Sequence, residues 1–190
     1  MTDPQIGDLL QMVRELSDKE AIRSCMYRYA RGIDRCDPEL LRTVFWPDGT
    51  VSMGGAYNGP AYGLIDFAIP NLSRMEATQH LFGNMLIELS GDAANVETYS
   101  QCFHRMPADE ERGAFDVIVA VRYLDRFAKR DGEWRIESRM MLPDWFRQYP
   151  DSGDWDVGYF GQTLVPGETA GARKPSDQMY AFFGGQTAGA

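Results

Sequence analysis

Apolar residues follow a helical period in the first third of the chain. Ser17 to Glu20 reads S-x-x-E, a capping box that is typical of a helix start. The apolar residues that follow at helical spacing are Ile22, Cys25, Met26, Tyr29 and Ile33. We therefore expect a partly helical lead-in over residues 1–16 and a long helix that ends near residues 32–36. Asp37 predicts the cap of a second short helix, with Pro38 at its first position.

The pattern changes to strands after a third helical segment. Residues 61–72 predict that helix, in which Pro70 favours a break. A turn at residues 46–49 and a short strand at 50–53 precede it. Longer strands are predicted at 78–89, 94–106, 115–127 and 134–142, separated by short polar or glycine-containing turns. Helices followed by a strand meander indicate an α+β fold, with a curved antiparallel sheet and helices on one side.

Composition and charge narrow the classes of function. The chain has 190 residues, 44% of them hydrophobic, and a formal net charge of −9. This acidic balance disfavours a nucleic-acid partner and an anionic membrane surface, and no apolar 18-residue run predicts a membrane span. Three cysteines without a C-x-x-C motif favour a reducing, cytoplasmic location over a disulfide framework or a zinc cluster. Two histidines are too few for a histidine-rich metal centre, so we expect no metal.

Four motifs occur in an order that resembles the NTF2-like, or SnoaL-like, superfamily. They are Asp18-Lys19-Glu20-Ala21-Ile22 leading to Tyr27-x-Tyr29-x-x-x-x-Asp34, then Phe45-x-x-Asp48-Gly49, His80-x-x-x-Asn84 and Asp131-Gly132-x-Trp134-Arg135-Ile136. The resemblance covers roughly residues 12–146. It implies a cone-shaped, curved antiparallel sheet wrapped around N-terminal helices, a cystatin-like α+β barrel. We expect this domain at residues 1–148. Residues 149–190 form a tail that is either loosely ordered or lies over the pocket or a neighbouring subunit.

Within the superfamily, the chain is most similar to the group of scytalone dehydratase, bile-acid dehydratase and hexachlorocyclohexane dehydrochlorinase. In that group an aspartate of the first helix and a histidine of the sheet form a dyad, roles that would fall on Asp34 and His80. A second sheet histidine would be His104. The bile-acid enzyme also carries an arginine on its last strand, where this chain has Leu142 or a neighbour; Arg139 is nearby. The resemblance implies no cofactor and a homodimer or homotrimer.

The residue chemistry suits an acid–base role for this pair. An imidazole titrates near neutral pH, and a carboxylate bonded to one ring nitrogen fixes its tautomer. Asp34 lies near a helix C-terminus, where the helix dipole disfavours an anion, and a cationic partner would explain that position. Tyr29 shares the apolar stripe and is a candidate donor. Asp34 could instead cap the next turn, and His80 could be a core histidine.

Four further residues are candidates for substrate binding. Asn84 follows His80 by four positions and shares its sheet face unless a bulge intervenes. Tyr57 and Trp145 are aromatic candidates, and Cys102 shares a face with His104, although a small core residue is its commoner role.

The hypothesis from the sequence is therefore a cofactor-free lyase of aromatic-compound catabolism. It would eliminate water, another leaving group or a small carbonyl fragment from a hydrophobic, aromatic substrate. The alternatives are an isomerase or polyketide-type cyclase with the same pocket, and a non-catalytic subunit similar to the small subunit of ring-hydroxylating dioxygenases.

Overall fold

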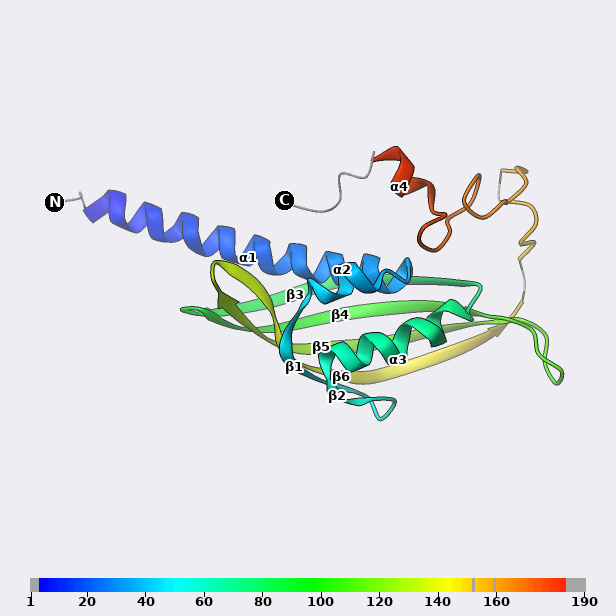
Figure 1. Cartoon of the computed structure of the whole chain (residues 1–190), viewed down its shortest axis with the longest axis horizontal. Helices are drawn as coiled ribbons and strands as arrows, with labels where there is room; N and C mark the ends of the chain where they lie inside the picture. The colour runs from blue at the N-terminus through cyan, green and yellow to red at the C-terminus, as the bar shows by residue number, and fades with distance from the viewer. Residues whose placement is uncertain (1–3, 152, 159, 184–190) are drawn as a thin grey trace.

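A curved sheet packed against helices makes up the molecule (Figure 1). The structure is a computed structural model and describes residues 4–151, 153–158 and 160–183. The helices are α1 (Pro4–Asp34), α2 (Pro38–Arg42), α3 (Ala61–Ser73) and α4 (Gln178–Phe182). The strands are β1 (Phe45–Met53), β2 (Asn58–Pro60), β3 (Ala77–Ser90), β4 (Ala93–Met106), β5 (Phe115–Arg130) and β6 (Glu133–Pro150). The predicted α+β class is confirmed.

The sheet is mixed and open. Its strand order is β2-β1-β6-β5-β4-β3. Strands β3 to β6 form the expected antiparallel meander, but β1 pairs with β6 in parallel. The expectation of a purely antiparallel sheet was therefore wrong at this one pairing. Because β2 and β3 lie at opposite edges and do not pair, the sheet curves around the helices without closing into a barrel.

Helix α1 is longer than its sequence pattern predicted. It runs unbroken from Pro4 to Asp34, so Ser17 lies inside the helix and does not cap it. Residues 5–17 are exposed, and this part of α1 extends beyond the sheet (Figure 1). The capping-box reading failed because residues 4–16 themselves consist mainly of good helix formers. In the part of the chain that the structure describes, no helix is both long and apolar enough to span a bilayer.

Three other local predictions have different outcomes. The predicted cap of α2 is confirmed, because the Asp37 carboxylate accepts a 3.1 Å hydrogen bond from the Leu40 N–H. Residues 46–49, expected to be a turn, belong to β1, whose pairing with β6 is irregular between Phe45 and Thr50. Pro70 does not break α3, since the helix continues to Ser73.

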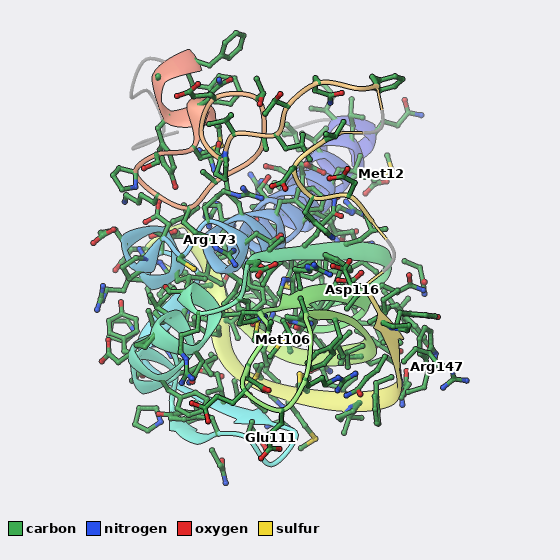
Figure 2. The ribbon with its side chains drawn as sticks, turned by 90° about the vertical axis from the view of Figure 1, so that its right-hand side faces the viewer. Met12, Met106, Glu111, Asp116, Arg147 and Arg173 are labelled. Carbon is green, nitrogen blue, oxygen red and sulfur yellow. The ribbon has the colours of Figure 1, made fainter. Side chains whose placement is uncertain are left out.

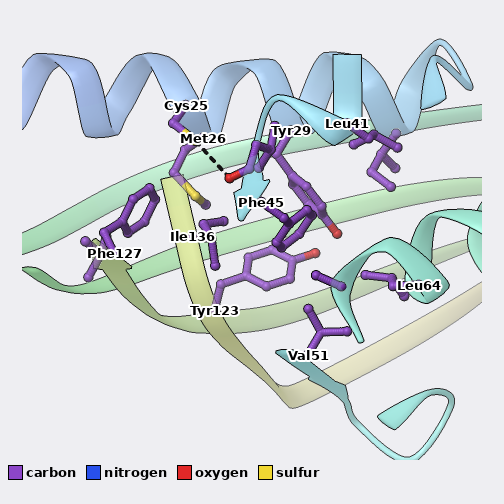
Figure 3. Packing of buried hydrophobic residues seen from close by; sticks show 14 of the residues in the cluster. Cys25, Met26, Tyr29, Leu41, Phe45, Val51, Leu64, Tyr123, Phe127 and Ile136 are labelled. Carbon is purple, nitrogen blue, oxygen red and sulfur yellow. Dashed lines mark hydrogen bonds between the residues drawn. The ribbon is translucent and has the colours of Figure 1, made fainter. Parts of the chain in front are cut away.

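The core lies between α1 and the concave face of the sheet. Tyr29 from α1, Phe45 from β1 and Tyr123 from β5 meet at its centre, each no more than 2% exposed (Figure 3). The Cys25 thiol donates to the Val44 carbonyl at 3.5 Å and joins α1 to the start of β1. The helical stripe predicted from Ile22 to Ile33 is therefore the buried face of α1.

Candidate functional site

The last residue of α1 bonds to a histidine of the sheet. Asp34 and His80 are 46 positions apart, yet Nδ1 of the His80 ring lies 2.8 Å from Oδ1 of Asp34. Oδ2 of the same carboxylate accepts the backbone N–H of His80, also at 2.8 Å. The side chains are 7% exposed for His80 and 10% for Asp34. Both carboxylate oxygens are thus committed to one residue, which fixes the orientation of the ring.

The chain reversal after Asp34 holds the carboxylate in place. Cys36 has a φ of 51°, in the left-handed region, and ends the helix. The Asp37 N–H donates to the Gly32 carbonyl at 2.8 Å, which closes the turn. A Cβ on Gly32 would lie 2.8 Å from the Leu41 side chain, so only glycine lets α2 pack this closely.

Electrostatics favour the charged form of His80. Burial lowers its pKa, but the Asp34 carboxylate and the Cys102 thiol outweigh burial and raise the pKa to about 9. Near neutral pH the His80 ring is therefore a buried imidazolium. The ring can donate a proton there, and it becomes a free base as the pH approaches 9.

Two residues of β4 stand beside the His80 ring. His104 meets it edge to face, with ring centroids 5.7 Å apart at 88°. Burial and the nearby His80 charge lower the pKa of His104 to about 4, so its ring is neutral at pH 7. Cys102 is opposite His80 in the strand register and is 3% exposed. Burial raises its pKa, but the hydrogen bond and charge of His80 outweigh that effect and lower it.

Tyr29 lies deeper in the core than the dyad. Its ring stacks on Phe82, the next inward-facing residue of β3 after His80, with centroids 6.4 Å apart. It also meets Tyr123 edge to face at 5.8 Å. Burial raises the pKa of its phenol, so Tyr29 stays protonated at neutral pH. It can act as a neutral hydrogen-bond donor in this position.

A buried ion pair packs against the rings of Tyr29 and Tyr123. Arg139 donates to both carboxylate oxygens of Asp125, at 2.7 and 2.8 Å, and both side chains are 0% exposed. The guanidinium carbon lies 4.1 Å from the centroid of the Tyr29 ring and 4.4 Å from that of Tyr123. Sequence reasoning left the role of Arg139 open and missed Asp125. The available signal was strand parity, because Asp125 continues the inward series of β5 after Tyr123.

Three candidate substrate residues are not brought to the dyad. Asn84 is exposed, because β3 is bulged between Phe82 and Met85 and the extra residue reverses its side-chain alternation. Tyr57 packs on Phe67 and donates to the Pro60 carbonyl. Trp145 is 44% exposed, opposite Ala120 in the register. The bulge that the prediction for Asn84 named as its exception is present, so Asn84 and His80 lie on opposite faces of β3.

The lining of two cavities in the described part of the protein includes neither Asp34 nor His80. The larger, of about 610 Å³, lies against outward-facing residues such as Leu86, Glu97 and Met140. The other, of about 490 Å³, lies between the start of β3 and residues 155–173; we call it the tail cavity. Its wall includes Thr78, which is opposite His104 in the register, and Arg173. The tail cavity is therefore next to the strand segment that carries the dyad histidine.

The residues that the structure describes contain no group of three or more His, Cys, Asp or Glu side chains that could hold a metal ion.

Comparison with known proteins gives a domain family and a fold. Residues 14–140 match the model of the SnoaL-like domain. A search of curated proteins finds no match.

Among solved structures, three relatives share this fold. The first, a proposed scytalone dehydratase from Novosphingobium aromaticivorans, is 24% identical over 73% of this chain and 91% of its own, with a TM-score of 0.63. A hexachlorocyclohexane dehydrochlorinase of type 2 is 22% identical over 81% and 97%, with a TM-score of 0.65. A proposed aromatic ring hydroxylase from N. aromaticivorans is 19% identical over 70% and 94%, with a TM-score of 0.61. At these identities the likeness establishes the fold alone.

Proposed function

The chain belongs to the SnoaL-like domain family, and on that premise we propose that it is a cofactor-free lyase that works through the Asp34–His80 pair. The observation that carries the proposal is the pair of hydrogen bonds between the Asp34 carboxylate and His80. One carboxylate oxygen orients the ring, and the other accepts the backbone N–H of His80. A carboxylate placed this way stabilises the imidazolium that forms when the ring takes a proton.

The proposed step is an elimination. The base is the neutral form of the His80 ring, whose share rises as the pH approaches 9, so turnover should rise with pH towards that value. In this form His80 takes a proton from a carbon next to an electron-withdrawing group. The C–H electrons form a new double bond, and the leaving group departs with its own bonding pair. For loss of water, the imidazolium returns its proton to the departing hydroxyl, so protons balance over the turnover. Neutral His104 and the Tyr29 phenol are the proposed polarising donors. Proton transfer of this kind needs no metal or organic cofactor.

The tail cavity is the proposed entry for substrate. Its volume of about 490 Å³ suits a mid-sized ligand. Trp155, Leu164 and Pro166 provide the apolar part of its wall, which also carries Arg35, Glu76, Asp156 and Arg173. This apolar part supports a hydrophobic, aromatic substrate. Access from the cavity to the dyad would follow Thr78 and His104, which adjoin His80 on β3 and β4.

The experiment compares two substitutions on the same strand. Purified protein is screened for elimination on β-hydroxy carbonyl and halogenated cyclic compounds. His80→Gln should lower kcat by about 10² to 10⁴-fold, the usual contribution of a positioned base. Gln79→Ala, exposed on the opposite face of β3, should leave kcat unchanged. A His80→Gln variant with near-normal turnover would remove the proposal.

An isomerase or cyclase would use the same base. Turnover in deuterated water distinguishes it, because an isomerase returns a solvent-derived deuteron to the product and releases no fragment. A non-catalytic subunit has less support, since nothing in that role requires a buried carboxylate bonded to an imidazole.

A further inference from the structure

The tail after β6 folds back over the end of α1. Residues 172–180, which we call the tail clamp, make contacts with α1, α2 and the loop between them. Arg35 donates to Ala172 O at 2.7 Å and to Asp177 at 3.0 Å, Lys174 pairs with Asp37 and Glu39 at 2.8 Å each, and the Tyr180 hydroxyl donates to Asp37 at 3.1 Å. The clamp therefore sits on the turn that follows the dyad carboxylate.

Arg173 of this clamp lies beside the end of α1 (Figure 2). Its Nη1 donates to the backbone carbonyl of Asp34 and, at 2.7 Å, to the Thr78 hydroxyl. Its Nη2 donates to the carbonyls of Leu72, at 3.2 Å, and Met75, at 3.5 Å. One guanidinium thus joins the end of α1, the end of α3 and the start of β3. Two of those elements supply Asp34 and His80.

The charge of Arg173 is satisfied by carbonyl oxygens and not by a carboxylate. Across the described ranges, no ion pair to Arg173 is formed. Two of its acceptors are carbonyls at or near the C-termini of α1 and α3, where the helix dipoles are negative. Asp34 places a carboxylate at that same end of α1, where it is disfavoured. A cation at its backbone carbonyl offsets the penalty.

We propose that Arg173 is a positioning residue of the active site, which holds the α1 terminus against β3 so that the Asp34 carboxylate and the His80 ring stay bonded. This inference rests on the proposed function and deepens it. It makes Arg173 of the C-terminal tail a supporting part of the active site, although it lies 139 positions from Asp34.

A titration of His80 and His104 reports the charges of the groups around these two rings. Besides the rings themselves, the groups are Asp34 from α1, Cys102 from β4 and Arg173 from the tail. Arg173 adds to the effects that lower the pKa of His104. Since the chain has only two histidines, their ring protons give a simple NMR spectrum that His104→Gln assigns.

The test substitutes Arg173→Gln and compares it with Lys174→Gln. The control removes a neighbouring cation of the clamp that touches neither α3 nor β3. In Arg173→Gln we expect the pKa of His104 to rise, the pKa of His80 to fall by about one unit, and the His80 amide to exchange about tenfold faster. Lys174→Gln should leave all three unchanged. Arg173→Lys keeps the charge but has one nitrogen for four acceptors, so its values should lie between wild type and Arg173→Gln.

The inference would be overturned if Arg173→Gln folds and leaves unchanged the pKa values of His80 and His104 and the exchange rate of the His80 amide. If that variant does not fold, Arg173→Lys decides by the same readouts. Asp34→Asn separates this failure from failure of the proposed function. If Asp34→Asn lowers the pKa of His80 and Arg173→Gln does not, the dyad stands without the tail. If Asp34→Asn has no effect, the proposed function itself fails.

Discussion

The buried Asp125–Arg139 pair provides a sharp test of how the core is held together. Asp125→Asn keeps the shape of the side chain but leaves the guanidinium of Arg139 without its counter-charge, at a site where both side chains are 0% exposed. Removing one partner of a buried pair costs about 3–5 kcal/mol. The rings of Tyr29 and Tyr123, 4.1 and 4.4 Å from the guanidinium carbon, offset part of this cost. We therefore expect a loss near the lower limit, about 3 kcal/mol.

Urea unfolding followed by tryptophan fluorescence measures this loss. For a domain of this size, about 3 kcal/mol corresponds to a fall in Tm of roughly 6–12 °C. The double variant Asp125→Leu, Arg139→Met replaces the charged pair with apolar groups and should lose less than Asp125→Asn. A loss below about 1 kcal/mol in Asp125→Asn, or a double variant that loses more than Asp125→Asn does, would refute this account of the pair.

Two further predictions concern packing and pH. Gly32→Ala should lower the free energy of unfolding by about 1–2 kcal/mol, because its Cβ would lie 2.8 Å from Leu41; an unchanged or higher Tm would contradict it. The raised pKa of His80 should stabilise the protein fully below pH 6.5, and that stability, roughly 3 kcal/mol at most, should be lost between pH 6.5 and about 9. The lowered pKa of His104 acts at acid pH. The stability that its neutral ring contributes to the protein is present above pH 6.5 and is lost as the pH falls towards about 4. Chemical denaturation from pH 4 to 9 checks both. His80→Gln should flatten the alkaline limb and also weaken the acid limb, because the His80 charge helps to lower the pKa of His104.

The sequence predicted most of the fold because its strands alternate over most of their length and its helical stripe is regular. It located four strands of the meander to within a few residues, except that β6 continues to Pro150. The parallel pairing of β1 with β6 was not predictable, because no local pattern encodes which edge a strand joins. Nor was the full length of α1, since its N-terminal part is exposed and lacks a buried face to mark it.

The sequence predicted part of the candidate site. Asp34, His80, His104 and Cys102 come together, and the family resemblance together with strand parity had pointed to them. Asn84 does not join them, because a bulge at residues 83–84 has no signature in this sequence beyond Gly83.

Long-range partners were the least predictable part of the site. Arg173 lies in a segment rich in glycine and proline, and its acceptors are mainly backbone carbonyls, which any residue provides. Sequence patterns report burial and periodicity, whereas such contacts depend on the finished tertiary fold.

Proton binding at His80 tests the central claim most directly. In wild-type protein, an NMR titration of the ring proton should give a pKa of about 9. In Asp34→Asn the ring loses its carboxylate partner while burial remains, so the pKa should fall by at least about 2 units. A wild-type value near 6.5 that Asp34→Asn leaves in place would contradict the claim that these two residues form a functional dyad.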